Sequence, residues 1–214
     1  MEHELFESIS QRIRGTENEE NFRILEITHE LVRRCSLYES QLRESKTDVR
    51  HSDRERLVTE DFAAECDTWV PINKVFHLGA PGPSGHENDT YVSEDVIYKV
   101  NNLLNSNGSV IQHFNKILLH NLLFVETSYV FYGFTGFIGS SIMPIFKQPL
   151  IKNATPATMV EISTYMAALG FRSTPETGRF TNDEFEVWDL FPRNVLKDSE
   201  GDIFVIDAEI KLIK

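Results

Sequence analysis

Cysteine and basic residues are scarce in this sequence, and each scarcity excludes a class of protein. Only two cysteines, Cys35 and Cys66, occur among 214 residues. They lack the spacing of a metal site or a disulfide framework, which predicts a reducing, cytoplasmic setting. Lys and Arg total 21 against 33 Asp and Glu, for a net charge of -12. This balance argues against gripping nucleic acid by phosphate neutralisation and against docking on an anionic membrane surface.

We expect neither a secretory leader nor a membrane span in this sequence. The first ten residues, MEHELFESIS, are acidic where a signal peptide is basic and then apolar, so we do not expect secretion. Residues 127–146 carry no charge and are long enough to span a bilayer. They nevertheless contain Gly133, Gly136, Gly139 and Pro144. We therefore predict two buried strands around a turn, with a membrane span as the alternative.

Residues 1–70 have the periodicity of helices. Their apolar side chains recur at steps of three and four, as at Ile24, Ile27, Leu31, Cys35, Tyr38 and Leu42. The polar stretch 44–51 predicts a loop, and Ser52 with Glu55 resembles a capping box that opens a further helix. We interpret these helices as packing on the domain that follows. Binding of a protein partner through residues 1–70 is the alternative.

From Pro71 onward the pattern changes to strands, turns and shorter helices. We predict strands at 72–76, 91–92, 96–100 and 184–188, and a helix at 110–123. A segment rich in Gly and Pro, residues 78–88, lies between the first two strands. A second helix is predicted to begin with Thr155 as N-cap and Pro156 as its first residue, and to end at Gly170.

Two carboxylates and a carboxamide gather in residues 187–209. Asp189 and Asn194 lie in one loop, and Asp207 follows a second apolar run after a turn at 198–201. A hairpin would bring all three side chains to the same end. Their oxygen atoms are hard ligands of the kind that Mg²⁺ prefers.

The order of these motifs is more specific than any single motif. A Gly-rich segment precedes a strand lysine, Lys99, and Asp-Leu-x-x-x-Asn at 189–194 precedes Asp207. This order resembles the protein-kinase fold. In more detail the chain is similar to the kinase-like domain of polyvalent proteins of phages and conjugative mobile elements, over roughly residues 70–210. That similarity rests on Ser-Gly-x-Glu-Asn at 84–88, Gln148-Pro149, and Trp-Asp-x-x-Pro-Arg-Asn at 188–194.

The resemblance implies an α+β, two-lobed, kinase-like fold. Residues 1–70 would form a helical extension, residues 71–150 a β-rich N-lobe, and residues 151–214 a minimal C-lobe. The resemblance further implies an ATP- and Mg²⁺-dependent phosphotransferase acting on an unidentified hydroxyl substrate.

The resemblance also implies a role for each matching residue. Lys99 would pair with ATP phosphates, and Asp189 would accept or orient the proton of the attacking hydroxyl. Asn194 and Asp207 would hold Mg²⁺. The remaining nucleotide-binding residues would be Gly82, Ser84 and Gly85 over the phosphates, and Gln148 and Leu150 in an adenine hinge that acts through backbone groups. A plain turn is the alternative for the glycines, and a surface strand lysine is the alternative for Lys99.

Three departures from a typical kinase are visible. No acidic residue lies between Asp95 and Glu126, so Lys99 must pair with Glu87, Glu126 or Asp207, or remain unpaired until ATP binds. Val-Trp replaces His-Arg before Asp189. Only seven residues follow Asp207, so we expect no activation segment and no platform for a protein substrate.

These departures leave two alternatives to an active enzyme. One is a nucleotide-binding pseudokinase or interaction module of a mobile element. The other is a non-kinase structural or regulatory protein, in which Lys99 would lie far from Asp207.

Overall fold

The computed structural model describes residues 2–15, 18–45 and 50–213, and it mixes helices with three antiparallel sheets. The mixed helix-and-sheet class is as predicted. Three N-terminal helices come first, at α1 (Glu2–Ile13), α2 (Glu19–Ser45) and α3 (His51–Glu65). The loop predicted at 44–51 is only partly described. Helix α2 continues to Ser45 and α3 begins at His51, while residues 46–49 lie outside the described residues.

The largest sheet has five strands in the order β1-β2-β3-β5-β4. Its strands are β1 (Ala80–Pro81), β2 (Asn88–Ser93), β3 (Val96–Asn101), β4 (Val130–Phe137) and β5 (Ser141–Pro149). The uncharged segment thus forms two paired strands, as predicted, with a bulge between Phe131 and Gly133. Among the described residues, no helix has both the length and the apolar character needed to cross a membrane.

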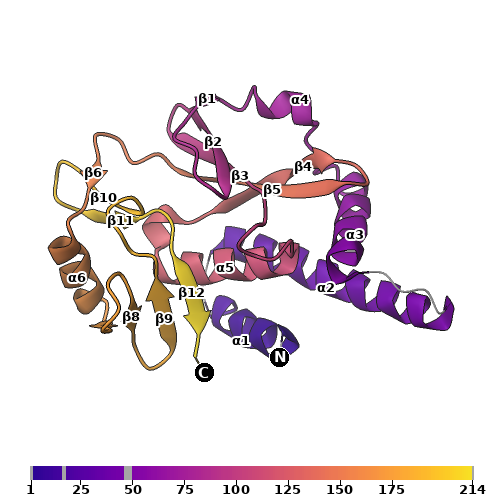
Figure 1. The fold of residues 1–214 in the computed structure, drawn as a ribbon, viewed down its shortest axis with the longest axis horizontal. Coiled ribbons are helices and arrows are strands. Elements are labelled where there is room, and N and C mark those ends of the chain that lie inside the picture. The colour runs from indigo at the N-terminus through magenta and orange to yellow at the C-terminus, as the bar shows by residue number, and fades with distance from the viewer. Residues whose placement is uncertain (1, 16–17, 46–49, 214) are drawn as a thin grey trace.

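Helix α5 (Val110–Leu123) lies below this sheet and above α1 in the view of Figure 1. Ser109 caps α5 by accepting a hydrogen bond from the backbone N–H of Gln112 at 3.1 Å. The helix itself matches the prediction. A short 3₁₀ turn, η1 (Val125–Thr127), then leads into β4.

The remaining elements form two smaller sheets around helix α6 (Met159–Ala168). One sheet contains β6 (Thr155–Pro156), β10 (Val195–Lys197) and β11 (Ile203–Val205). The other contains β7 (Arg172–Ser173), β8 (Phe180–Thr181), β9 (Phe185–Trp188) and β12 (Glu209–Leu212). The predicted hairpin of residues 187–209 is therefore present, with Val195 opposite Val205.

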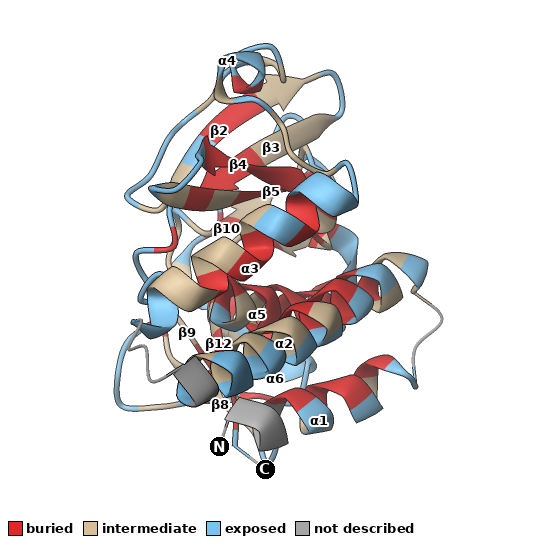
Figure 2. Cartoon of the chain, turned by 90° about the vertical axis from the view of Figure 1, so that its right-hand side faces the viewer, coloured by how far each residue is buried: buried red, intermediate tan, exposed pale blue. Residues whose placement is uncertain are grey.

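The N-terminal helices share one hydrophobic core with the rest of the chain. Buried residues of α1 and α2, among them Ile9, Ile24 and Leu31, belong to the same cluster as Phe114 of α5 and Phe131 of β4. Figure 2 shows buried residues along α5 and on the sides of α1 and α2 that face it. The interpretation that these helices pack on the following domain is confirmed.

A buried amide pair joins α2 to α5. The Nδ2 of Asn121 donates to Oδ1 of Asn21 at 2.7 Å and to the Tyr129 carbonyl at 2.8 Å. The Tyr129 N–H in turn donates to Oδ1 of Asn121 at 2.7 Å. Both asparagine side chains are almost fully buried. Their hydrogen bonds satisfy polar groups that would be costly to bury alone.

Three local predictions are wrong. Residues Ile72–Val75 form a short helix, α4, instead of a strand. Thr155 and Pro156 form strand β6, and α6 begins after Thr158, which makes a capping box with Glu161.

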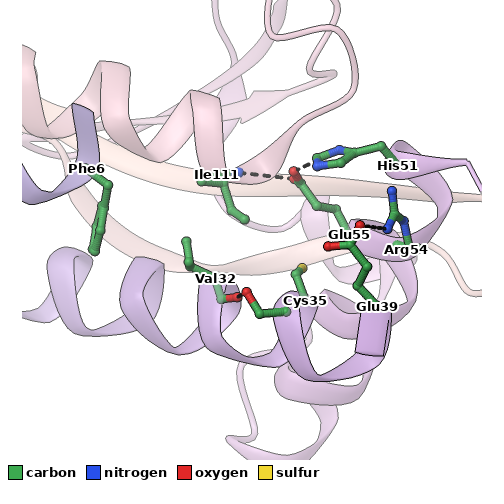
Figure 3. Close-up of a pocket in the computed structure, with 9 residues that line it drawn as sticks. Phe6, Val32, Cys35, Glu39, His51, Arg54, Glu55 and Ile111 are labelled. Carbon is green, nitrogen blue, oxygen red and sulfur yellow. Dashed lines mark hydrogen bonds and ion pairs between the residues drawn. The ribbon is translucent and has the colours of Figure 1, made fainter. Parts of the chain in front are cut away.

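The third error concerns Ser52 and Glu55, because α3 has no side-chain cap. The Glu55 carboxylate instead accepts a hydrogen bond from Ser109 Oγ at 2.9 Å. It also accepts one from the Ile111 N–H at 3.3 Å (Figure 3). Glu55 therefore caps α5, a helix more than fifty residues away in the sequence, and not its own helix.

Candidate functional site

Lys99 on β3 and Asp207 after β11 lie at the same small cavity in the folded chain. The Nζ of Lys99 donates to the carbonyl of Ile206 at 2.8 Å and to the Tyr129 hydroxyl at 3.2 Å. Lys99 and Asp207 line the same small cavity. The non-kinase alternative required these two groups to lie far apart, and the structure contradicts that separation.

Lys99 donates its hydrogen bonds to neutral acceptors. Its side chain is buried, and burial lowers the pKa of its ammonium group to about 8, although the nearby Asp207 carboxylate favours the charged form. The sequence left two possibilities, an acidic partner among Glu87, Glu126 and Asp207 or no acidic partner until ATP binds. The structure agrees with the second, because the Ile206 carbonyl and the hydroxyl of Tyr129, which lines the same cavity, accept the hydrogen bonds of Lys99.

Asp189 and Asn194 belong to a tightly hydrogen-bonded loop between β9 and β10. Asn194 Nδ2 donates to Oδ2 of Asp189 and to its backbone carbonyl, both at 2.8 Å. Arg193 also pairs with the Asp189 carboxylate. Asp189 has a φ of 63°, in the left-handed region that non-glycine residues seldom adopt and that recurs at functional sites.

This loop connects directly to the cavity of Lys99. The Ile206 N–H donates to the Asn194 carbonyl at 2.9 Å, while the Ile206 carbonyl accepts from Lys99. A continuous chain of hydrogen bonds thus runs from Asp189 through Asn194 and Ile206 to Lys99. The structure places four predicted site residues, Lys99, Asp189, Asn194 and Asp207, in one neighbourhood.

The donor atoms here fit a small, hard cation. Asn194 donates its amide hydrogens to Asp189, which leaves its side-chain oxygen as the available ligand atom. The carboxylate of Asp207 is 29% exposed, and the pKa of that group is held below its usual value because Lys116 and Lys99 outweigh the effect of burial. The described residues contain no group of three or more His, Cys, Asp or Glu arranged to hold a metal. Such a group is not required for Mg²⁺, which is commonly bound by one or two carboxylates together with substrate phosphates.

The Gly-rich segment turns back on strand β2 and donates backbone hydrogen bonds to it. The N–H of Gly82 donates to the Thr90 carbonyl at 2.9 Å, and the N–H of Gly85 to the Asn88 carbonyl at 3.0 Å. Ser84 Oγ accepts from the Thr90 N–H at 3.4 Å. A Cβ at Gly82 would lie 2.6 Å from Thr90 Oγ1, whereas one at Gly85 would meet open space. Packing against β2 therefore explains Gly82, and the turn interpretation accounts for the N–H groups of both glycines.

The predicted hinge residues stand at the end of β5. Gln148 pairs with Ile97 of β3, and its buried side chain donates from Nε2 to the Thr127 carbonyl at 2.6 Å. The Leu150 N–H donates to the Asp95 carbonyl at 2.8 Å. In the described part of the chain, pairing of β5 with β4 reaches only as far as Lys147. Gln148 is therefore paired on the β3 side alone.

Lys116 of α5 is a residue that sequence reasoning missed. Its Nζ lies 2.6 Å from Oε1 of Glu209, 3.5 Å from Oδ1 of Asp207 and 4.0 Å from Oε2 of Glu87. Burial opposes the ammonium form, yet these carboxylates raise the pKa of Lys116 above its usual value. A signal was present, because Lys116 follows His113 by three residues and precedes His120 by four, which puts all three on one helix face.

A comparison with models of protein families found one match. Residues 52–214 match the family model Kinase-PolyVal, described as a serine/threonine/tyrosine kinase found in polyvalent proteins. The match covers more than half of the chain and starts in α3, earlier than the expected residue 70. A search of curated proteins found no match.

Proposed function

Because the chain belongs to the family of serine/threonine/tyrosine kinases found in polyvalent proteins, we propose that it is an ATP- and Mg²⁺-dependent phosphotransferase that acts on a hydroxyl group. The observation that supports this proposal is the hydrogen-bond chain from Asp189 through Asn194 and Ile206 to Lys99. Phosphoryl transfer depends mainly on positioning and charge neutralisation. These hydrogen bonds hold in place the groups that would provide both.

Each residue has a role that follows from its chemistry. Lys99 would direct its ammonium group toward the phosphates, and Asp207 and Asn194 would hold the metal ion. Asp189 would accept the proton of the attacking hydroxyl group once Arg193 releases its carboxylate. Bound Mg²⁺ would supply charge neutralisation on the phosphate oxygens.

The architecture that goes with this function has two lobes. Residues 71–150, with the five-stranded sheet, would be the N-lobe, and residues 151–214, with the two smaller sheets, a minimal C-lobe. The adenine would lie near the backbone of residues 147–150, where β5 is paired on the β3 side. The two lobes would meet at Lys99 and Ile206, whose hydrogen bond spans 107 residues of sequence.

A nucleotide-binding pseudokinase is the second candidate, and specific observations favour it. The N–H groups of Gly82 and Gly85 already donate to carbonyls of β2, and Arg193 already pairs with the Asp189 carboxylate. In addition, α5 carries a lysine, Lys116, in the part of the fold where a typical kinase has a glutamate. This candidate binds Mg–ATP without transferring phosphate.

Variants of the two carboxylates separate the candidates. We expect Asp189→Asn and Asp207→Asn to reduce ATP turnover by about 10²–10⁴-fold, the range typical of a lost acid–base or charge-stabilising group. The measurement is Mg²⁺-dependent ATP hydrolysis or autophosphorylation. Asp202→Asn is the matched control, because Asp202 is an exposed carboxylate on the same hairpin.

The outcomes distinguish activity from binding. Equal ATP turnover in wild type and both variants would contradict the proposal that the protein is an active phosphotransferase. Thermal stabilisation by Mg–ATP without any turnover would support the pseudokinase. A folded wild type with no response to nucleotide would exclude both candidates.

A further inference from the structure

Lys116 ties together three segments that meet at the candidate site. Its ammonium group lies within 4.0 Å of Glu87 at the end of the Gly-rich turn, of Asp207 after β11, and of Glu209 at the start of β12. These segments are brought together only by the tertiary fold. A single side chain of α5 therefore controls how the Gly-rich turn and the Asp207 segment are placed relative to one another.

The charges around Lys116 require a cation at its position. Three carboxylates face Lys116, and the other cation in the cavity, Lys99, gives its hydrogen bonds to neutral acceptors. Asn105 also donates a hydrogen bond to Glu87, which fixes that carboxylate from the other side. Without the Lys116 ammonium group between them, the Asp207 and Glu209 carboxylates would repel each other.

The geometry leaves part of Asp207 available. Lys116 approaches Oδ1 of Asp207 at 3.5 Å, while its short hydrogen bond goes to Glu209 at 2.6 Å. Lys116 is also the less exposed of the two side chains, at 15% against 29% for Asp207.

From these contacts we propose that Lys116 is the positioning residue that orients Asp207 toward the divalent metal ion, acting through its ion pairs with Glu209 and Glu87. This inference rests on the proposed function. In a typical kinase a strand lysine pairs with a glutamate of the helix. Here the helix, α5, supplies the lysine, and the metal-binding segment supplies the carboxylate. Lys116 acts on Asp207 and does not itself contact nucleotide.

The test measures how much Mg²⁺ strengthens the binding of ATP. Affinity is measured by calorimetry with and without Mg²⁺, in wild type, Lys116→Met, Lys116→Arg and Glu209→Gln. We expect Lys116→Met to reduce the Mg²⁺-dependent gain in affinity by about 10- to 100-fold, the usual effect of losing a group that orients a metal ligand. Affinity for metal-free ATP should stay unchanged.

The companion variants exclude a purely structural role. Lys116→Arg should restore most of the gain because it keeps the charge. Glu209→Gln should lose part of the gain, and its effect should not add to that of Lys116→Met, because the two residues act as one unit. Lys211→Met, which removes an exposed lysine of β12, is the matched control and should behave as wild type.

Each outcome decides the proposal. A folded Lys116→Met protein that keeps the full Mg²⁺ gain overturns it and leaves the proposed function intact. Equal losses with and without Mg²⁺ also overturn it, because Lys116 would then contact the phosphates. If Lys116→Met does not fold, a Glu209→Gln protein that keeps the full Mg²⁺-dependent gain in ATP affinity overturns the proposal instead. Wild-type protein that binds no ATP overturns the proposed function together with this inference.

Discussion

Glu55 is a carboxylate held almost entirely out of water at the start of a helix. Its side chain accepts hydrogen bonds from Ser109 and from the backbone of Ile111, and His51 lies 3.5 Å from it. Burial nevertheless dominates and raises the pKa of the Glu55 carboxyl above its usual value. The folded protein therefore favours protonated Glu55 more than the unfolded chain does.

The stability of the folded protein should consequently fall as the pH rises through the raised pKa of Glu55. The contribution of Glu55 is complete below the ordinary glutamate pKa and is lost as the pH rises through the raised pKa of the folded state. We expect the free energy of unfolding of wild type, relative to Glu55→Gln, to decrease across that interval. Urea unfolding at a series of pH values measures it.

Two further variants sharpen the experiment on Glu55. Glu55→Ala should be destabilised by about 1–3 kcal/mol at acidic pH, because Ser109 and Ile111 lose their acceptor. Repeating the series in a His51→Gln background separates the contribution of the neighbouring imidazole. A wild-type profile parallel to that of Glu55→Gln would show that Glu55 does not titrate differently in the folded state.

At the scale of elements, α6 shows how a helix start is fixed. Thr158 Oγ1 accepts from the Glu161 N–H at 3.3 Å, and the Glu161 carboxylate accepts from the Thr158 N–H at 2.8 Å. Glu161 also pairs with Lys197 of β10 at 2.6 Å. Glu161 thus completes the N-terminal cap of α6 and, through Lys197, attaches α6 to the neighbouring sheet.

The two threonines near this helix start should differ in importance. We expect Thr158→Ala to lower the free energy of unfolding by about 1 kcal/mol, the typical value of an N-cap. Thr155→Ala should have a smaller effect, since Thr155 lies on β6 and its hydroxyl donates only a 3.5 Å hydrogen bond to Lys197. Denaturant midpoints of the two variants provide the comparison. Equal losses would contradict the assigned cap.

The local errors of prediction have physical explanations. Ile72, Val75 and Phe76 are separated by three and one residues, a spacing that suits a helical turn as well as a strand. Thr155-Pro156 has the composition of a helix start, but Pro156 pairs with Leu196 at a sheet edge, where a missing N–H is tolerated. The longer helix at residues 110–123 was predicted correctly, because many of its positions fit the helical period.

At the scale of the whole molecule, the larger of two hydrophobic clusters among the described residues runs from α1 to β12, and the smaller one contains Val75, Tyr91, Val100 and Ile145. We therefore expect residues 1–70 and the remainder to unfold in one cooperative transition. Trp69 lies near the end of α3 and Trp188 on β9, so a single-tryptophan variant for each reports on a different region. Their denaturation midpoints should coincide with each other and with the loss of helical circular dichroism.

A variant of the amide pair extends this test. Asn21→Leu removes the acceptor of a buried hydrogen bond from Asn121 and should cost about 1–3 kcal/mol. Both tryptophan probes should shift by the same amount. Two separate midpoints, or a shift seen by only one probe, would show that the N-terminal helices form an independent unit.

At this scale, the sequence predicted which groups of the site would meet but not how they are neutralised. The order of motifs predicted the convergence of Lys99, Asp189, Asn194 and Asp207, because each lies at a strand or loop that the kinase resemblance places. The partners of Lys99 and the role of Lys116 depend on helix rotation and side-chain reach. Such details are fixed by packing across the core, which one-dimensional spacing does not encode.

The amide pair of Asn21 and Asn121 also bears on how such a chain can be inherited. Tyr129 bonds to Asn121 through its backbone and to Lys99 through its hydroxyl, so α2 is three hydrogen-bonded steps from the candidate site. The family match begins only at residue 52. A recombination event that exchanged the helices before that point would also have to bring an acceptor for Asn121. The residues at positions 21 and 121 should therefore be inherited together when genes recombine, even though only position 121 lies within the matched residues 52–214.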